Sequence, residues 1–299
     1  MLGVLAMSGC GSAPQPPPED RAFEVDATFD TSGLGLSGPT GICIGPGGVV
    51  CVADTGNHRI VLIEEDRGLT VTTIGEFGSG FVEFNKPTGL ARLGDDIVVT
   101  DSGNRRVQVV TMSGGFVRAF GASGTQDGEF MRPTFVATSG GSIYVVDSQR
   151  PRVQVFTSAG VLERAFGQFG AGLGAFANPR GVAVSGGVTY VADGEGDRIE
   201  MFDALGFVVG AFGGSGDAFG ELRGPEGVAV ANGEVYVADS GNDRVQVFST
   251  DGQALSTFPD ASSASEMSKP TGIAVDSAGQ VYVTNVGSNL VQRWKPTDT

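Results

Sequence analysis

The 299-residue sequence is poor in histidine, which occurs once, and in charged residues, which make up 18% of it. A zinc site built from several histidines is therefore excluded, because zinc needs three or four nitrogen or sulfur ligands from the protein. A catalytic triad needs only one histidine, but no nucleophile motif accompanies His58. We expect His58 to be a turn residue.

Clusters of basic residues are also missing. Asp and Glu outnumber Lys and Arg by 34 to 19, for a net charge of −15, and the densest basic segments are Arg105–Arg106 and the pair Arg150 and Arg152. Proteins that bind nucleic acid usually present a basic patch. We therefore expect no nucleic-acid partner.

Helical periodicity and long apolar runs are absent as well. No segment repeats its apolar residues about every 3.6 positions, which predicts almost no helix. Beyond the first few residues, no segment is apolar enough to span a membrane.

What the sequence does contain is an internal repeat with a step of 45 to 48 residues. Prolines mark its six copies: Pro39, Pro87, Pro133, Pro179, Pro225 and Pro270. In five copies an aspartate follows, with an arginine five residues beyond it: Asp54 and Arg59, Asp101 and Arg106, Asp147 and Arg152, Asp193 and Arg198, Asp239 and Arg244. The sixth copy has Asn285 and Leu290 instead. A pair that recurs in this way suggests one structural task, in which aspartate accepts turn hydrogen bonds and arginine pairs with it or with a neighbouring blade. Five ligand contacts are the alternative.

Each copy holds four short apolar runs bounded by turn residues, which are typical of β-strands. In the fifth copy the runs are Gly227–Val230, Glu234–Ala238, Arg244–Ser249 and Gln253–Phe258. Four strands per repeat indicate a propeller blade, and a blade needs neighbours to cover both of its faces. The sequence therefore predicts an all-β fold, a six-bladed β-propeller of four-stranded antiparallel blades.

The sixth copy stops after its third strand, Leu290–Trp294. We predict that the strand-like segment Phe23–Phe29 supplies the missing outer strand, which would close the ring and hide two sheet edges. Residues 23–299 then form one propeller domain, and residues 1–22 lie outside it.

The first residues are apolar and small up to Cys10, and the Gly/Ser/Pro/Gln-rich segment Gly11–Pro18 suits a spacer. The segment Met7–Cys10 resembles the lipobox of bacterial lipoproteins. The resemblance implies lipidation of Cys10, a location outside the cytoplasm in the bacterial cell envelope, and membrane contact only through a lipid anchor. A disordered N-terminus with an incidental cysteine is the alternative.

Two further cysteines, Cys43 and Cys51, lie on the first two strands of the first copy, across the turn Gly45–Gly48. With a three-residue loop they would face each other. A cross-strand disulfide, which an exported protein would favour, and two buried thiols both remain open.

The segments Asp239–Phe248 and Asp54–Ile60 resemble the core of the NHL repeat, and the resemblance extends from Pro39 to Trp294. It departs at Phe135, where other copies have glycine, and at Pro151. The family implies a six-bladed propeller that serves mostly as a binding platform. One branch is a group of lyases with zinc on several histidines, and related propellers of the gluconolactonase type hold calcium in the channel.

Residues that break the repeat are our candidates for ligand binding. The position after each proline should lie at the mouth of the central channel: Thr40, Thr88, Thr134, Arg180, Glu226 and Thr271. Arg180 and Glu226 would orient a ligand there, unless they merely pair with each other. The loops between blades add Phe81, Phe169, Asp127, Glu129, Arg132, Asp217 and Arg223, since loops on a rigid scaffold commonly carry function.

These observations favour a monomeric, non-catalytic binding scaffold that docks a protein or glycan on its loop face and needs no cofactor. The alternative is an enzyme of the lactonase or lyase type with calcium in the channel, held by oxygen ligands.

Overall fold

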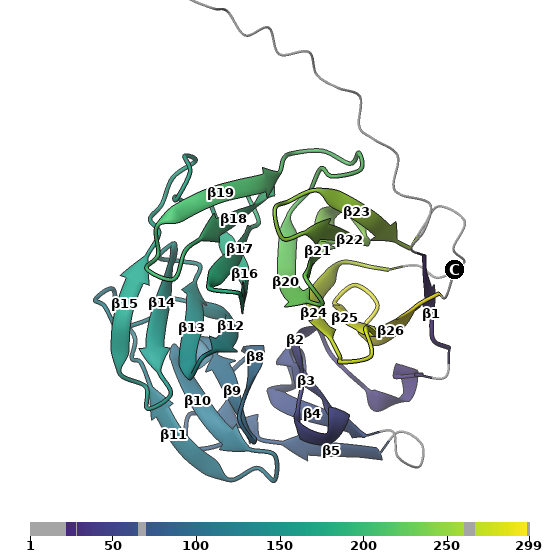
Figure 1. Ribbon diagram of the computed structural model, residues 1–299. Helices are drawn as coiled ribbons and strands as arrows, with labels where there is room; N and C mark the ends of the chain where they lie inside the picture. Colours follow the sequence, from purple (N-terminus) through teal and green to yellow (C-terminus); the bar gives the residue numbers. More distant parts are fainter. Residues whose placement is uncertain (1–21, 28, 65–69, 260–266, 298–299) are drawn as a thin grey trace, which may run out of the picture.

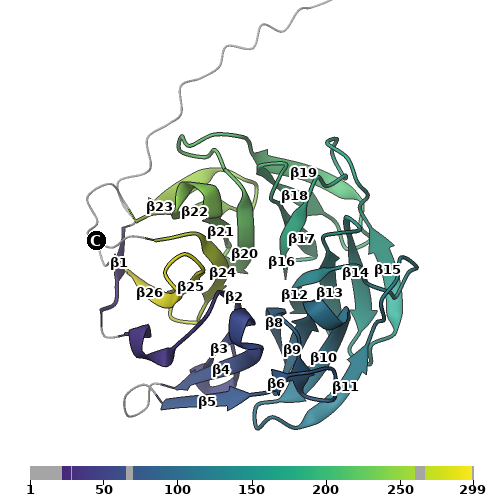
Figure 2. The same cartoon turned by 180° about the vertical axis from the view of Figure 1, so that it is seen from behind.

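A computed structural model describes residues 22–27, 29–64, 70–259 and 267–297. Six four-stranded antiparallel sheets form a ring around a central channel, and Figures 1 and 2 show its two faces. The predicted fold, a six-bladed β-propeller, is confirmed.

The blades follow one another along the chain, each with its first strand innermost. Blade 1 comprises β2 (Pro39–Ile44), β3 (Val50–Asp54), β4 (Arg59–Glu64) and β5 (Thr70–Ile74). Blade 2 comprises β8 (Pro87–Leu93), β9 (Asp96–Asp101), β10 (Arg106–Thr111) and β11 (Phe116–Phe120). Blade 3 comprises β12 (Pro133–Ser139), β13 (Ser142–Asp147), β14 (Arg152–Thr157) and β15 (Leu162–Phe166). Blade 4 comprises β16 (Pro179–Ser185), β17 (Val188–Asp193), β18 (Arg198–Phe202) and β19 (Val208–Gly213). Blade 5 comprises β20 (Pro225–Ala231), β21 (Glu234–Asp239), β22 (Arg244–Ser249) and β23 (Ala254–Phe258).

Blade 6 joins the two ends of the chain. It comprises β24 (Pro270–Val275), β25 (Val281–Asn285), β26 (Leu290–Pro296) and β1 (Phe23–Val25). Strand β1 pairs antiparallel with β26 in the register Phe23↔Pro296 to Val25↔Trp294, as the incomplete sixth copy predicts. It is shorter than Phe23–Phe29, because the amide of Phe29 turns back to the carbonyl of Asp26.

Helix within the described residues is limited to five three-residue 3-10 turns, in keeping with the missing helical period. They are η1 (Ser32–Leu34), η2 (Pro46–Gly48), η3 (Thr55–Asn57), η4 (Ser102–Asn104) and η5 (Ser240–Asn242). Two short strands, β6 (Glu76–Phe77) and β7 (Glu83–Phe84), pair in parallel within the loop that joins blades 1 and 2.

Large apolar side chains fill the space between neighbouring blades. Phe84, Phe130, Phe176 and Leu222 each lie three residues before a repeat proline and are fully buried. The aromatic residue on the third strand packs close by, as in the contact of Phe176 with Phe202 at 5.5 Å between ring centroids. These contacts form an apolar layer at each blade interface, which supplies the main driving force for closing the ring.

The innermost strands approach one another so closely that they require glycine. A Cβ atom on Gly227 would lie 2.2 Å from the carbonyl oxygen of Thr271 in the next blade, and one on Gly41 would lie 2.1 Å from that of Thr88. Real atoms do not come so near, so the repeat keeps glycine there. Blade 3 departs with Phe135, whose side chain packs at the edge of the blade 3 core.

Cys43 and Cys51 are direct cross-strand partners in blade 1. The Gly45 amide donates to the Val49 carbonyl at 2.8 Å, which leaves the three-residue loop Pro46–Gly48. Both thiols are buried and free in this structure. The hydrogen bond with the Cys51 thiol, together with burial, raises the pKa of Cys43. The disulfide stays a prediction.

Candidate ligand-binding face

One face of the ring carries the turn between the second and third strands of each blade and the loops between blades; we call it the loop face. The repeat aspartate connects this turn to the loop that precedes the inner strand of the same blade. In blade 1 Oδ1 of Asp54 accepts the amide of Ser37 at 2.7 Å, and Oδ2 accepts Nε of Arg59 at 2.7 Å. The carboxylate is completely buried. It therefore fixes the loop that enters the inner strand against the turn of the same blade.

The same arrangement recurs at Asp101 with Arg106 in blade 2 and at Asp239 with Arg244 in blade 5, at 2.8 and 2.7 Å. Blades 3 and 4 differ. Arg152 reaches Asp127 at 2.6 Å and lies 3.8 Å from Asp147. Arg198 lies 2.7 Å from Glu200 and 3.7 Å from Asp193.

The turns of blades 3 and 4 also have a different backbone path. In blades 1, 2 and 5 the amide of a glycine two residues after the aspartate donates to the loop, and a Cβ there would meet loop atoms at 2.4 to 2.7 Å. In blades 3 and 4 the donor is one residue earlier, at Ser148 and Gly194. The next position is then free to carry a side chain, and it holds Gln149 and Glu195.

Of the four threonines after the repeat prolines, three donate their hydroxyl groups to the neighbouring blade. Thr40 donates to the carbonyl of Thr88 at 2.9 Å, Thr88 to that of Thr134 at 2.9 Å, and Thr134 to that of Arg180 at 3.2 Å. Thr271 donates to the carbonyl of Lys269 in its own blade at 3.1 Å. Thr134 and Thr271 are buried. The first task of Thr40, Thr88 and Thr134 is to hold neighbouring inner strands together.

Arg180 and Glu226 face each other across the boundary between blades 4 and 5. Nε of Arg180 lies 3.8 Å from Oε1 of Glu226, and both side chains are about one quarter exposed. Burial raises the pKa of Glu226, and the guanidinium groups of Arg180 and Arg132 act in the opposite direction. The two residues thus form an ion pair at the channel rim, and Arg132 of blade 3 lies near enough to contribute to the potential there.

A pocket of about 410 Å³, here called the mouth pocket, opens on the loop face over blades 1 to 3. Its lining is mostly hydroxyl, amide and cationic: Thr40, Thr55, Lys86, Thr88, Ser102, Gly103, Arg105, Met131, Arg132 and Gln149. Lys86, Arg105 and Arg132 bring three positive charges to one opening. The sequence singled out only Arg132 among them.

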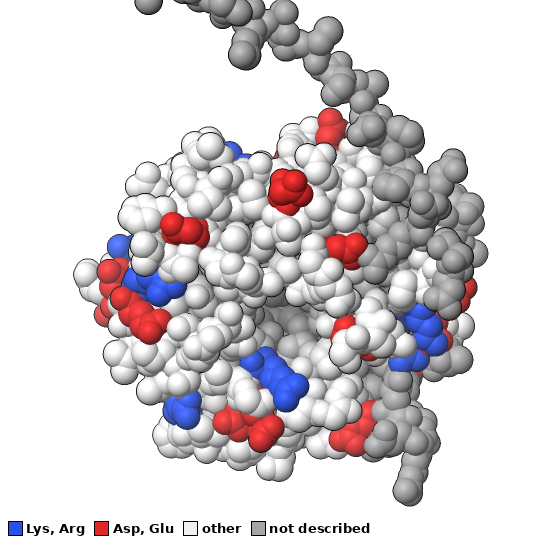
Figure 3. Space-filling model, viewed as in Figure 1, with Lys and Arg blue, Asp and Glu red and all other residues white. Residues whose placement is uncertain are grey.

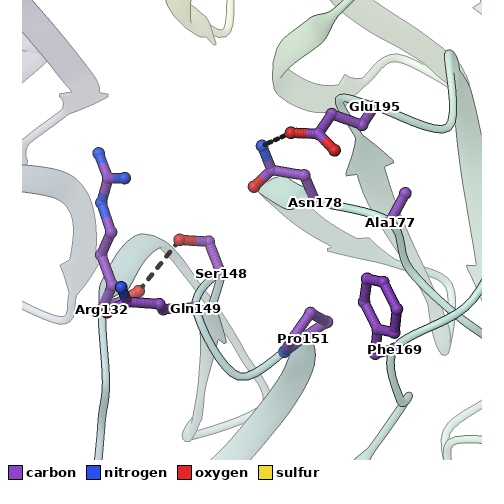
Figure 4. Close-up of a pocket in the computed structure, with 8 residues that line it drawn as sticks. All are labelled: Arg132, Ser148, Gln149, Pro151, Phe169, Ala177, Asn178 and Glu195. Carbon is purple, nitrogen blue, oxygen red and sulfur yellow. Dashed lines mark hydrogen bonds between the residues drawn. The ribbon is translucent and has the colours of Figure 1, made fainter.

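A second pocket of about 290 Å³, here called the side pocket, lies between blades 3 and 4. It is lined by Arg132, Ser148, Gln149, Pro151, Phe169, Ala177, Asn178 and Glu195. Figure 4 shows Asn178 and Glu195 joined by a hydrogen bond of 3.1 Å, and Phe169 beside Pro151 and Ala177. The guanidinium group of Arg132 points away from Phe169 in this view. Arg132 and Gln149 line both pockets, so the two adjoin.

The remaining loop residues predicted to bind a ligand line neither pocket. Arg223 lies 4.0 Å from Asp217 on an exposed loop. Asp127 holds Arg152, and Oε2 of Glu129 accepts the amide of Gln126 at 2.8 Å. Phe81 is 70% exposed and stacks on Phe116 at 4.1 Å.

His58 occupies a left-handed turn position with φ of 58°. Its Nδ1 accepts the amide of Lys86 at 3.0 Å, and its ring contacts Phe77. Arg105, Asp197, Asp243 and Asn289 hold equivalent positions with φ between 51° and 57°. His58 is the turn residue of its blade.

Among the pocket residues that sequence reasoning missed are Gln149, Glu195, Asn178, Lys86 and Arg105. The signal was present in the repeat. Four of the six copies have glycine two residues after the aspartate or asparagine, whereas the third and fourth have Gln149 and Glu195. Copies with a larger side chain at a glycine position mark the place where a repeat has been adapted.

The described residues contain no group of three or more His, Cys, Asp or Glu that could hold a metal ion. Across the same residues, no helix is long and apolar enough to cross a membrane. Cys10 and the rest of residues 1–21 lie outside the described residues. Figure 3 shows one face of the molecule, hollowed at the centre of the ring, with basic and acidic residues scattered over it.

Comparison with protein families identifies the repeat. Four stretches, residues 36–61, 84–110, 222–248 and 267–294, match the model of the NHL repeat. The chain carries NHL repeats. These NHL stretches fall in blades 1, 2, 5 and 6, and blades 3 and 4, which bear the side pocket, are the two outside them. A search of curated proteins finds no match.

Several solved structures share the overall fold of this chain at low sequence identity. A streptogramin B lyase superposes with a TM-score of 0.66 at 16% identity, over 92% of this chain and 98% of the lyase. A gluconolactonase from Xanthomonas campestris gives 0.65 at 17% identity, over 88% and 87% of the two chains. A chain of a nidogen/laminin complex gives 0.61 at 20% identity, over 79% and 84%. At such identities the likeness concerns the fold alone.

Proposed function

We propose that this NHL propeller is a non-catalytic binding scaffold that docks a protein or glycan ligand on its loop face. The observation that carries the proposal is the pair of adjoining pockets that meet at Arg132. Both volumes are near the lower end of the usual range for ligand sites, which is about 300 to 1,000 Å³. The side pocket lies where blades 3 and 4 depart from the repeat, so its lining is particular to this chain and not a by-product of the fold.

The proposal includes a location outside the cytoplasm, with an anchor at Cys10. Its support is the apolar segment that ends at Cys10 and the spacer that follows. Labelling of producing cells with a radioactive or clickable fatty acid tests this part. We expect label on the wild-type protein and none on Cys10→Ala; label on both would overturn the anchor at this residue.

Partner capture tests the binding role. The immobilised protein is exposed to envelope extract from its source organism, in parallel with Arg132→Gln plus Gln149→Ala and with Arg92→Gln. Arg92 is the last residue but one of β8, at the opposite face, so its loss matches the charge change without touching the pockets. We expect a ligand retained by the wild type and by Arg92→Gln and lost by the double variant. Equal retention by all three would place binding elsewhere.

A second candidate is an enzyme of the lactonase or lyase type. The observation in its favour is Glu226, a rim carboxyl whose pKa is raised by burial beside Arg180, because groups with shifted pKa values cluster at functional sites. A lyase and a gluconolactonase share the fold, yet fold does not decide function. A virginiamycin B lyase from Staphylococcus aureus is catalytically inactive when one of its histidines is replaced by alanine; in the present chain the one histidine holds a turn.

Metal analysis and turnover separate the two candidates. An enzyme with oxygen-ligated calcium would retain one equivalent of calcium after dialysis and would turn over lactone substrates, with loss of turnover in Glu226→Gln. A scaffold would show saturable binding, no turnover and no stoichiometric calcium.

A further inference from the structure

The mouth pocket gathers positive charge on a protein whose net charge is −15. Lys86 and Arg132 are exposed, and neither side chain forms a hydrogen bond or ion pair within the described part of the chain. Arg105 donates to the hydroxyl of Ser123 at 2.6 Å, so it keeps its full charge as well. Of the nearby carboxyls, Glu226 lies near enough to interact with Arg132, but it already faces Arg180 at 3.8 Å. Cations gathered around one opening favour an anionic group there, and they would also steer it towards the opening.

The side pocket offers a different chemistry directly beside this charge. The ring of Phe169 is 77% exposed, with the apolar Pro151 and Ala177 next to it (Figure 4). Gln149, Asn178 and Glu195 complete the lining with planar polar groups. An open aromatic face with amides and a carboxylate around it matches a sugar ring, which presents an apolar C–H face and a rim of hydroxyl groups.

We infer that the ligand is an acidic oligosaccharide, with one sugar ring on Phe169 in the side pocket and the carboxylate of a neighbouring uronic acid at Arg132 and Lys86 in the mouth pocket. The inference rests on the proposed function, which it deepens by naming the ligand class. Arg132 joins the two halves because it lines both pockets, and its guanidinium group can bind a carboxylate through two parallel hydrogen bonds.

The same observations disfavour the other classes of macromolecule. The core of a protein interface is rich in aromatic and other apolar anchors, whereas Phe169 is the one aromatic residue that lines either pocket. Nucleic acid needs cations along an extended track, and outside this opening the negative net charge opposes it. An acidic sugar chain needs only local cations and many hydroxyl partners.

Glu195 adds a requirement on the sugar in the side pocket. Its Oε1 accepts Asn178, and a carboxylate is an acceptor only. It can bind a sugar hydroxyl but repels a second carboxylate. The ring on Phe169 is therefore best neutral or oriented with its acid group away, which predicts a chain in which acidic and neutral units alternate.

The test is calorimetric titration of the full chain with trigalacturonate, with its methyl ester, and with an alternating tetrasaccharide of glucuronate and N-acetylglucosamine. We expect saturable binding of an acidic probe, strongest for the alternating one, and loss of binding for the methyl ester. Binding should weaken steeply between 50 and 500 mM salt, since exposed charges are screened. Methyl ester and acid binding equally would overturn the inference.

Variants locate the site. Removal of one charge-assisted hydrogen-bonding group should weaken binding about tenfold to a hundredfold in Arg132→Gln. Phe169→Ala should weaken the binding of both acidic probes without changing how steeply that binding falls with salt, and Arg92→Gln should leave the affinity unchanged. Equal affinities of Arg132→Gln and Arg92→Gln would overturn the assignment, as would the absence of binding to any acidic probe. If partner capture still yields a protein or a neutral glycan through the loop face, the scaffold function stands and the acidic ligand class is wrong.

Discussion

The buried carboxyl of Glu200 occupies a position where blade 3 has a glutamine, and it cannot make all the hydrogen bonds that the glutamine makes. In blade 3 the equivalent Gln154 donates to the carbonyl of Glu129 and accepts the amide of Gly128, both at 2.8 Å. Glu200 accepts the amide of Gly174 at 2.9 Å but has no proton to donate when ionised. Its Oε1 lies near Arg198 yet makes no well-directed hydrogen bond, and burial raises its pKa.

We therefore expect Glu200→Gln to stabilise the protein by about 1 kcal/mol at neutral pH. The amide can donate to the loop as in blade 3, and Arg198, whose Nε has no hydrogen-bond partner, becomes free to approach Asp193. Urea unfolding measures the change. The control is Glu24→Gln at an exposed position, which should leave the free energy of unfolding unaltered; a loss of stability in Glu200→Gln would contradict the expectation.

The gain from Glu200→Gln should depend on pH with a definite sign. A folded-state pKa above the unfolded value means that the folded protein holds the proton more tightly. Well below pH 4.5, the ordinary pKa of glutamate, Glu200 is protonated in both states and its burial does not destabilise the wild type through ionisation. The wild type loses stability as the pH rises through the folded-state pKa. The difference between variant and wild type should be smallest near pH 4 and largest near pH 8. A constant difference would show that ionisation is not its cause.

At the scale of elements, closure depends on β1, a strand of three residues. Phe23 is 9% exposed and stacks on Phe258 of blade 5 at 4.3 Å between ring centroids. Asp26 then anchors the segment to β26 through Arg293 and Lys295. Side-chain packing and charge thus compensate for the few backbone hydrogen bonds that so short a strand can make.

Phe23→Ala should therefore destabilise the protein by about 3 kcal/mol, the usual loss for a buried phenylalanine. It should also raise the tendency to aggregate, because a loosened β1 uncovers the edge of β26. Denaturant unfolding and light scattering report the two effects. Phe207→Ala, at a residue that is 68% exposed, serves as the matched control and should change neither.

Elements such as these were largely predictable because their signals are local. The third strand of blade 5 has the bounds that the sequence predicts, Arg244–Ser249. The predicted strand Phe23–Phe29 forms, but it ends at Val25. The candidate site was less accessible. The threonines recur with the repeat, which predicts their position at the mouth of the channel. Their hydrogen bonds to the next blade depend on tertiary geometry and could not be predicted. Gln149 and Glu195 stand out only when the six copies are compared at a turn position that holds glycine in the other four.

For the whole molecule, the ring makes every blade interface depend on the others. At five of the six interfaces a glycine of one inner strand lies against the backbone of the next, and a Cβ on Gly89 would lie 2.6 Å from the carbonyl oxygen of Thr134, between blades 2 and 3. Because a closed ring fixes the sum of the angles between blades, a wider separation at one interface must be absorbed by the rest. Local strain should thus be felt on the far side of the ring.

Gly89→Ala tests this coupling, with Trp294 of blade 6 as the remote probe. We expect about 3 kcal/mol of destabilisation, as for other overpacked sites, and one transition in which Trp294 fluorescence and far-ultraviolet circular dichroism shift together. Gly172→Ala is the matched control, because a Cβ there meets no atom within 4 Å, and it should leave both curves in place. A Trp294 transition that stays at the wild-type denaturant concentration while the dichroism curve shifts would mean that the blades unfold independently and that the ring transmits no strain.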